Sequence, residues 1–424
     1  MNKKPQISFY TLGCKLNQAE TAALKNAAKE KGYNIVPFSD VSDIMVVNSC
    51  TVTGRADRKT RQALYQARRR SPEGILVLLG CYPQVNPKQS TLISDVDIVL
   101  GTHDKFDVFS AIDTFMETGE QYAFISPVDN NTRPDSTFIA ATERTRAFLK
   151  VQEGCDNFCT FCIVPYARGN PVSRNFQDTL TEARRLVDAG YREIVLSGID
   201  IGAYKDEDKD LLELIRALED IKGLDRIRIS SIEMNTLHDA LIRYIGSSEK
   251  VMPHFHLSLQ SGSDTILRAM GRKYLCEDFT RKVETIRKYI PGASIGTDVI
   301  VGFPGESDAL FIETMGYINK IAFSYLHIFR YSARKGTPAA TMKDPVSENR
   351  KKERASLLND TDRLLREKFA AGFYGTRQPV LWENFEDGML YGHTPHYLQV
   401  RIPGQVKRKN TVSEIMLERD NILL

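Results

Sequence analysis

The sequence predicts an α/β protein of three domains. Its 424 residues exceed one ordinary domain, and 42% hydrophobic with 26% charged residues is typical of a globular chain. Short apolar runs alternate with helical patterns over most of the length, which indicates parallel strands joined by helices. The predicted domains cover residues 1–130, 140–370 and 375–424.

The N-terminal domain is predicted to hold a parallel sheet with thiols at its edge. The strands span Ile7 to Leu12, Asp43 to Asn48 and Ile75 to Gly80, and they are followed by Cys14, Cys50 and Cys81. Because ligands gather beyond the carboxyl ends of parallel strands, we expect these thiols to converge. A buried inert thiol is the alternative for any one cysteine, but three at equivalent strand ends favour ligation.

Two helices are predicted between these strands, over Thr21 to Lys31 and Arg55 to Arg70. The second is either an RNA contact or a solvated face, and we favour RNA. It carries seven basic residues, namely Arg55, Arg58, Lys59, Arg61, Arg68, Arg69 and Arg70. A polar stretch from Asp129 to Ser136 then predicts a linker.

The middle domain is predicted to contain about six βα units, as an open or partial (β/α) barrel. Its strands are expected at Phe148–Gln152, Glu193–Ser197, Arg226–Ser230, His254–Gln260, Ser294–Val301 and Ser324–Phe329. Its helices are expected at Thr179–Ala189, Leu211–Asp220, Asp239–Ile245, Asp278–Tyr289 and Asp308–Lys320.

The C-terminal part is predicted as a charged helix and a small antiparallel β module. The helix covers Glu348 to Ala370, and strand-like pieces with turn residues run from Gln378 to Leu424. From Thr376 onward the chain contains six basic and six acidic residues, so its net charge does not indicate an RNA-binding module.

The strongest motif is a C-x3-C-x2-C run made by Cys155, Cys159 and Cys162, directly after a predicted strand. Three thiolates suit an iron–sulfur cluster with one iron left open, to which S-adenosylmethionine could bind. A zinc site with a distant fourth ligand is the alternative. Cys276 has no partner nearby in the sequence, and we interpret it as structural.

This spacing resembles the radical S-adenosylmethionine superfamily. Thr11 to Gln18, Asn48 to Thr53 and Gly80 to Gln84 further resemble the N-terminal domain of its methylthiotransferases. The resemblance implies two [4Fe–4S] clusters. Cys155, Cys159 and Cys162 would hold the catalytic one, which cleaves S-adenosylmethionine to a 5′-deoxyadenosyl radical, and Cys14, Cys50 and Cys81 the auxiliary one, which carries the inserted sulfur.

Candidate residues for the S-adenosylmethionine pocket follow three predicted strands. Ser197 and Gly198 match a Gly-containing motif of the superfamily, and Gln260 and Gly302 lie at the ends of later strands. Ordinary turn chemistry is the alternative reading of these positions.

Several short sequence segments resemble the branch of this family that modifies threonylcarbamoyladenosine in tRNA. The segments that carry it are Thr11–Gln18, Arg144–Lys150, Arg272–Tyr274 and Tyr331–Pro338. The ribosomal-protein branch has Pro where this chain has Lys15, and the isopentenyladenosine branch has Gln-Met-Asn there. The expected reaction is methylthiolation at C2 of threonylcarbamoyladenosine at position 37 of tRNA. The other two reactions, and a non-catalytic iron–sulfur RNA-binding protein, are the alternatives.

The tail from Leu381 to Lys409 resembles TRAM, a small RNA-binding β-barrel. The expected partners are therefore tRNA, an electron donor and a system that supplies sulfur or clusters, and we expect a monomer. The chain shows neither a window of ~20 apolar residues nor an apolar signal segment at its start, so we expect a cytoplasmic protein with no membrane contact.

Overall fold

The computed structural model describes residues 4–91, 93, 95–128 and 145–424, and the chain divides into two compact units. The first unit comprises Met1–Ala141, Glu153–Val172 and Ser332–Ala340, and the second comprises Thr142–Gln152, Ser173–Tyr331 and Thr341–Leu424. The linker predicted at Asp129 to Ser136 lies outside the described residues.

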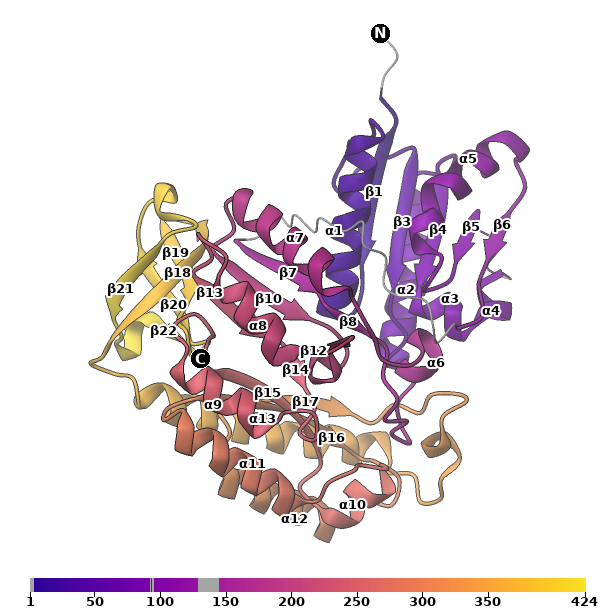
Figure 1. The fold of residues 1–424 in the computed structure, drawn as a ribbon. Coiled ribbons are helices and arrows are strands. Elements are labelled where there is room, and N and C mark those ends of the chain that lie inside the picture. The colour runs from indigo at the N-terminus through magenta and orange to yellow at the C-terminus, as the bar shows by residue number, and fades with distance from the viewer. Residues whose placement is uncertain (1–3, 92, 94, 129–144) are drawn as a thin grey trace. The chain divides into compact units, whose positions relative to one another are not determined.

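The first unit is built on a parallel sheet of six strands in the order β2-β1-β3-β4-β5-β6 (Figure 1). The predicted strands are confirmed within one residue at each end, and three short strands were not predicted. The bounds are β1 Gln6–Thr11, β2 Asn34–Ile35, β3 Ile44–Ser49, β4 Ile75–Gly80, β5 Ile98–Leu100 and β6 Tyr122–Phe124.

Helices cover both faces of this sheet. α1 (Lys15–Glu30) and α5 (Val108–Thr118) pack on one face, and α2 (Gly54–Arg70) packs on the other. The prediction for α2 is confirmed within one residue, whereas α1 begins six residues earlier than predicted. The remaining helices are α3 Cys81–Val85, α4 Pro87–Thr91, η1 Lys105–Asp107, α6 Val164–Arg168 and η3 Pro338–Thr341.

The second unit contains the predicted series of βα units. The strands of its two main sheets are parallel and pair in the orders β13-β10-β7 and β14-β15-β16-β17, with a bridge between Ile227 and Val251. The short strands β11 and β12 pair with each other in antiparallel fashion. The strand predicted at Arg226 to Ser230 is confirmed within one residue, and the short strand that follows it was not predicted. The strands are β7 Arg146–Lys150, β8 Gln152–Glu153, β9 Val172–Ser173, β10 Glu193–Ser197, β11 Lys205–Asp206, β12 Lys209–Asp210, β13 Arg226–Ile229, β14 Ser231–Ile232, β15 His254–Gln260, β16 Ser294–Val301 and β17 Tyr325–Arg330.

Alternation along these strands separates an apolar from a polar face. On β15, Phe255, Leu257 and Leu259 join the core under the helices, whereas His254 and His256 point to the other face. The helices are α7 Phe176–Asp188, η2 Ile201–Ala203, α8 Leu211–Glu219, α9 Asp239–Ser247, α10 Asp264–Ala269, α11 Cys276–Tyr289, α12 Asp308–Ile321 and α13 Glu348–Ala371.

The C-terminal segment forms the predicted antiparallel sheet, with five strands in the order β21-β18-β19-β20-β22. Trp382 is fully buried in its core, and its indole Nε1 donates to Ser413 Oγ at 2.8 Å. The elements are β18 Arg377–Glu386, β19 Met389–His393, β20 Gln399–Pro403, η4 Val406–Arg408, β21 Val412–Met416, η5 Arg419–Asn421 and β22 Ile422–Leu423.

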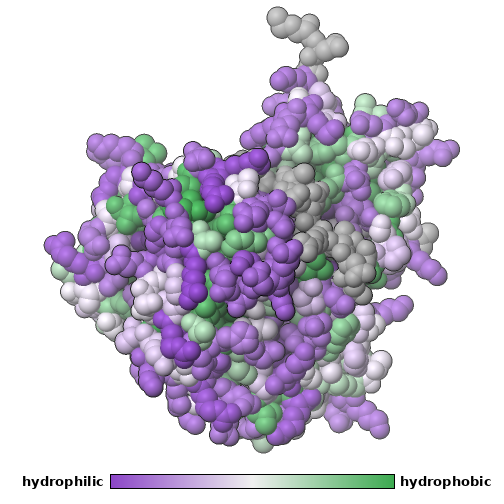
Figure 2. Space-filling view, in the orientation of Figure 1, coloured by the Kyte–Doolittle hydropathy of each residue, from purple (hydrophilic) through white to green (hydrophobic). Residues whose placement is uncertain are grey.

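Hydrophilic side chains cover most of the face shown in Figure 2, and the hydrophobic ones form scattered small patches. Within the described part of the chain, every helix is too short or too polar to cross a membrane.

Candidate functional site

The first three candidate thiols lie at one edge of the N-terminal sheet. β1, β3 and β4 are neighbours, and Cys14, Cys50 and Cys81 follow their carboxyl ends. Burial and then the neighbouring Cys81 raise the pKa of Cys50 to about 12, and Cys14 adds to this effect. The three thiols therefore lie near one another at this edge of the sheet.

Two polar side chains hold the three thiol-bearing loops together. Asn17 Nδ2 donates to the carbonyl of Leu12 at 2.7 Å and to that of Ser49 at 2.9 Å, which joins the loops of Cys14 and Cys50. Ser49 Oγ donates to the carbonyl of Leu79 at 2.7 Å and accepts from the amide of Tyr82, which joins the loops of Cys50 and Cys81. These hydrogen bonds therefore hold the backbone of the loops that carry Cys14, Cys50 and Cys81.

Gly13 allows the closest approach between two of these loops. Its φ is +103°, and a Cβ built there would lie 2.7 Å from Cys50 Cβ and 3.0 Å from Cys50 Sγ. An L side chain would meet both backbone strain and a steric clash at this position.

A Gly13→Ala substitution is expected to lower the iron and sulfide bound per chain, because it pushes the Cys14 and Cys50 loops apart. Chemical iron and sulfide analysis after anaerobic reconstitution measures this. Gly119→Ala is the matched control, since Gly119 also has a positive φ (+69°) but nothing lies within 4 Å of its added Cβ. Equal cluster content in both variants would show that the approach of Gly13 to Cys50 is unimportant.

The second set of thiols belongs to the same compact unit. Cys155, Cys159 and Cys162 lie in the loop before α6; Cys159 is buried and the other two are partly exposed. The amide of Cys155 donates to the carbonyl of Gly169 at 2.9 Å, and that of Cys162 donates to the carbonyl of Cys159 at 2.9 Å. Gly154 has a φ of +74°, and a Cβ there would lie 1.9 Å from the Asn170 carbonyl oxygen. The start of the loop, at Gly154 and Cys155, is thus in contact with Gly169 and Asn170 after α6.

Arg168, the last residue of α6, connects the two sets. Its guanidinium is buried and donates to Glu20 Oε1 at 3.0 Å, to Asn17 Oδ1 at 2.6 Å and to Glu153. Lys105 Nζ binds the same Glu20 carboxylate at 2.6 Å. Burial disfavours the charge, but Cys81, Glu20 and Glu153 raise the pKa of Arg168 well above its ordinary value. The buried guanidinium of Arg168 therefore lies near thiols as well as carboxylates.

An Arg168→Met substitution is expected to destabilise the first unit by about 3–5 kcal/mol, since it removes the buried cation that Glu20 and Glu153 share. Hydrogen exchange of peptides from α1 and from residues 153–172 measures this local stability. Arg192→Met is the control: its side chain is 45% exposed and pairs with Asp225, and a pair of this kind contributes about 1 kcal/mol at most. Equal protection of Arg168→Met and wild type would contradict the proposed role.

The segment Ser332–Ala340 packs against both thiol loops of the first unit. Ser332 Oγ accepts from the amide of Gly54 at 2.9 Å, next to the Cys50 loop. Arg334 Nη2 donates to Thr51 Oγ1 and to Asp57 Oδ2, both at 2.7 Å. The amide of Ala339 donates to the carbonyl of Thr160 at 2.8 Å. Residues far apart in the sequence therefore hold the thiol loops.

The candidates for the S-adenosylmethionine pocket lie at strand ends of the second unit. Ser197 ends β10 and is buried, and Gly198 has no room for a side chain beside Gln152 and Ile201. Gln260 ends β15 with a φ of +73°. The amide of Gly302, after β16, donates to Glu306 Oε1 at 3.0 Å. The same contacts are typical of ordinary turns that end a strand, which is the alternative to an S-adenosylmethionine site at these positions.

A hydrogen-bonded chain of side chains lies on the polar face of β15, β16 and β17. Tyr325 OH is bonded to His254 at 2.9 Å and to His256 at 3.2 Å, and Asp298 Oδ1 is bonded to His256 at 2.9 Å and lies 3.3 Å from His327 Nδ1. Burial opposes ionisation of Asp298, but the two histidines outweigh it and lower its pKa. Two imidazoles and a carboxylate are a donor set that divalent metals accept, yet these groups already satisfy one another.

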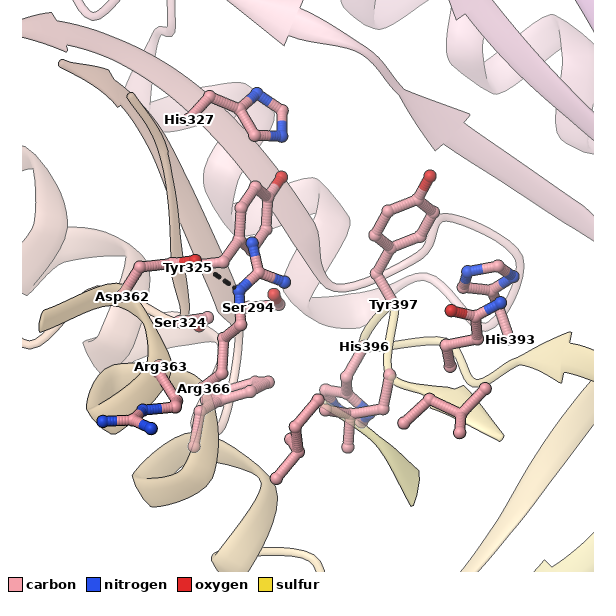
Figure 3. A pocket seen from close by; sticks show the side chains of 15 residues that line it. Ser294, Ser324, Tyr325, His327, Asp362, Arg363, Arg366, His393, His396 and Tyr397 are labelled. Atoms are coloured by element: carbon pink, nitrogen blue, oxygen red, sulfur yellow. Dashed lines mark hydrogen bonds and ion pairs between the residues drawn. The ribbon is translucent and has the colours of Figure 1, made fainter. Parts of the chain in front are cut away.

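A pocket of about 570 Å³ opens at the amino ends of β16 and β17, away from Gln260 and Gly302 (Figure 3). Its charges are compensated: Arg366 Nε donates to Asp362 at 2.7 Å, and His393 is bonded to Glu383 at 2.7 Å. Burial lowers the pKa of His396 to about 4, so this imidazole is neutral. The lining residues do not include the predicted site residues. They are Ser294, Ser324, Tyr325, His327, Asp362, Arg363, Arg366, Phe369, His393, His396, Tyr397, Leu398, Gln399, Leu423 and Leu424.

Sequence reasoning missed Arg168, Glu20 and Arg334. A usable signal was present for Glu20, because an acidic residue on the buried face of an Ala-rich helix requires a partner. For the two arginines the sequence holds no such signal, since Glu20 lies 148 residues from Arg168 and Asp57 lies 277 residues from Arg334.

Comparison with known proteins adds an independent observation. Residues 149–318 match the family model "Radical SAM superfamily", and residues 6–101 match "Uncharacterized protein family UPF0004". The chain is 41% identical over 407 residues to the threonylcarbamoyladenosine tRNA methylthiotransferase MtaB of Bacillus subtilis, covering 94% of this chain and 90% of the relative. It is 42% identical over 367 residues to the MtaB of Aquifex aeolicus, covering 86% and 89%.

Among solved structures, the fold is similar to that of the radical S-adenosylmethionine methyltransferase TsrM from Kitasatospora setae. The TM-score is 0.56 at 13% identity, and the match covers 80% of this chain and 77% of that one. At this identity the similarity concerns the fold alone.

Proposed function

The chain belongs to the radical S-adenosylmethionine tRNA methylthiotransferases, and from this premise we propose that it inserts a methylthio group at C2 of N6-threonylcarbamoyladenosine at position 37 of tRNA. The observation that carries the proposal is the 41% identity over 94% of the chain to a relative named for this substrate. The six cysteines of the two motifs, gathered in one compact unit, supply the donor atoms that the reaction requires.

The thiols of this chain fit two [4Fe–4S] clusters. Cys155, Cys159 and Cys162 would hold the catalytic cluster, and the converging thiols of the N-terminal sheet, Cys14, Cys50 and Cys81, would hold the auxiliary one. With S-adenosylmethionine bound, the clusters supply radical chemistry at an unactivated C–H bond and the sulfur that is inserted. The close approach of Gly13 to Cys50 and the bond from Asn17 to the Ser49 carbonyl support this fit, because they bring the loops of Cys14 and Cys50 together.

The other residues position these groups. Asn17 and Ser49 fix the thiol loops through backbone carbonyls, and Arg168 places a buried cation beside thiolates that would otherwise repel one another. Burial of Cys50, Cys81 and Cys159 limits the access of water to reactive groups. Ser197, Gly198, Gln260 and Gly302 are proposed to bind S-adenosylmethionine.

We propose the domain organisation that is expected of a radical S-adenosylmethionine methylthiotransferase. We assign residues 1–130 to the auxiliary-cluster domain, 140–370 to a partial (β/α) barrel with the radical site, and 375–424 to a TRAM-like RNA-binding domain. The six successive parallel βα units support the barrel, and the five-stranded antiparallel sheet supports the TRAM-like domain. A cytoplasmic monomer that receives electrons and sulfur from partner proteins completes the proposal.

Mass spectrometry of nucleosides from total tRNA tests the function. The gene is expressed in a host that lacks the activity, and the methylthio form of threonylcarbamoyladenosine is expected to appear. Appearance on isopentenyladenosine instead would keep the chemistry and change the substrate. An unchanged tRNA profile from a chain carrying both clusters would refute the tRNA assignment.

A further inference from the structure

The outward face of α2 is a stripe of cations without acidic neighbours. Its buried residues, Thr60, Ala63, Leu64 and Ala67, pack on the sheet. At 3.6 residues per turn, the exposed ones fall on the opposite side of the helix. We call seven of them the α2 stripe, namely Arg55, Arg58, Lys59, Gln62, Tyr65, Gln66 and Arg69. The remaining exposed residue, Arg61, donates to Tyr82 OH at 3.4 Å.

The cations of the α2 stripe are not used to hold the fold. Arg55, Arg58, Lys59 and Arg69 form no ion pair with any residue that the structure describes. The other arginines of the helix differ: Arg68 pairs with Asp97 at 2.6 Å, and Arg70 donates to the carbonyl of Phe38. The single acid of α2, Asp57, is engaged by Thr51 and Arg334 at 2.7 Å each. The stripe therefore carries uncompensated positive charge.

Three exposed arginines on α11 and α13 pair with acidic residues of their own helix. On α11, Arg281 pairs with Glu277 and Asp278. On α13, Arg350 pairs with Glu353, and Arg363 lies 3.7 Å from Asp360. Helix surfaces that serve solubility interleave both signs in this i,i+3 or i,i+4 manner. The α2 stripe has no such pair among the residues that the structure describes.

An aromatic ring accompanies the cations. Tyr65 is 60% exposed, and the Arg69 guanidinium lies over its ring at 5.7 Å. Exposed aromatic rings beside arginines stack nucleobases, and cations beside them neutralise phosphates. Gln62 and Gln66 add neutral donors between the charges.

The stripe begins next to the proposed auxiliary-cluster site. α2 starts at Gly54, four residues after Cys50, and Thr53 Oγ1 caps it by accepting from the amide of Ala56. From Arg55 to Arg69 the helix rises about 21 Å, at 1.5 Å per residue. A strand lying along it would run from the Cys50 loop outward past several backbone phosphates.

We infer that the α2 stripe binds the sugar–phosphate backbone of the tRNA substrate and aligns it with the Cys50 loop. The inference rests on the proposed function for the identity of the nucleic acid. It adds to that function a second RNA contact in the N-terminal domain, separate from the C-terminal sheet, whose own charges sum to zero from Thr376 onward.

The test measures binding of the full-length, cluster-loaded chain to tRNA that carries threonylcarbamoyladenosine without the methylthio group, over a range of salt concentrations. The test variant replaces Arg55, Arg58, Lys59 and Arg69 by Gln, which keeps helix propensity. The control variant replaces the same number of exposed cations outside α2 by Gln, namely Arg184, Arg185, Lys222 and Lys320. A third variant combines R55K, R58K and R69K and retains the charge. Iron content and circular dichroism verify that each variant is folded.

The test variant is expected to weaken binding by at least ~10-fold and to reduce the slope of log affinity against log salt by about 3, because each lost phosphate contact contributes 0.7–0.9 to that slope. The Lys variant is expected to keep the wild-type slope, and the control variant is expected to change it much less than the test variant. Equal changes in the control and test variants would overturn the inference, as would unchanged tRNA affinity in the test variant, which would point to an acidic protein as the partner of this face.

The proposed function is tested by a separate measurement, the formation of the methylthiolated nucleoside by the wild-type protein. Product formation combined with an unchanged test variant would refute the α2 surface alone. Binding that depends on α2 in a chain that never forms the product would refute the function alone.

Discussion

A Cys50→Ala variant is expected to keep cleaving S-adenosylmethionine while forming no methylthiolated nucleoside. Cys50 is the central thiol of the N-terminal set, since Gly13 packs on it and its pKa responds to both Cys81 and Cys14. Its removal leaves two thiols for the auxiliary cluster. The loop of Cys155 is closed by its own contacts with Gly169 and Asn170, so the catalytic cluster is retained.

Both products are measured in one reaction, 5′-deoxyadenosine by chromatography and the modified nucleoside by mass spectrometry. We expect methylthiolation to fall by more than ~100-fold, because loss of even a supporting partner of a metal ligand costs 10- to 100-fold. Cys276→Ala is the matched control: this thiol begins α11 in the second unit, and both products should persist. Retained methylthiolation in Cys50→Ala would overturn the assignment of the auxiliary cluster.

A Cys159→Ala variant is expected to lose both products. Cys159 is the buried member of the C-x3-C-x2-C loop, and its carbonyl accepts the amide of Cys162 at 2.9 Å, so the thiol and the loop turn are held together. Without it, two thiols remain and S-adenosylmethionine has no reductant. The auxiliary thiols stay in place, so about half of the iron should remain.

Iron analysis and the 5′-deoxyadenosine assay on the same preparation distinguish loss of one cluster from global unfolding. Iron near half of the wild-type content with no 5′-deoxyadenosine supports the assignment. Formation of 5′-deoxyadenosine at the wild-type rate would contradict it, and complete loss of iron would show that the two clusters are not independently held.

Regular periodicity made most of the fold predictable. α2 and α13 were predicted within one residue, because long patterned segments between clear end signals leave little freedom. The short strands β2, β5 and β6 were missed, since two or three residues carry no measurable alternation. α1 was predicted to start at Thr21 instead of Lys15 because the polar segment after Cys14 reads as loop. In the structure Leu16, Asn17 and Glu20 are buried there.

The candidate site also contains residues that could be predicted from the sequence and residues that could not. The convergence of Cys14, Cys50 and Cys81 could be expected, because neighbouring parallel strands end at the same sheet edge. The roles of Arg168 and Arg334 could not, because each depends on contacts that only the tertiary fold creates. Local patterns predict which residues bear chemistry, and long-range packing decides which charges surround them.

The make-up of the first unit has a consequence for synthesis on the ribosome. Its last segment, Ser332–Ala340, supplies the guanidinium that engages Thr51 and Asp57, almost three hundred residues upstream. The N-terminal sheet can form early, but the surroundings of the Cys50 loop are complete only after this segment has left the exit tunnel. For the proposed auxiliary cluster we therefore expect insertion late in synthesis, after the segment that carries Arg334 has been made.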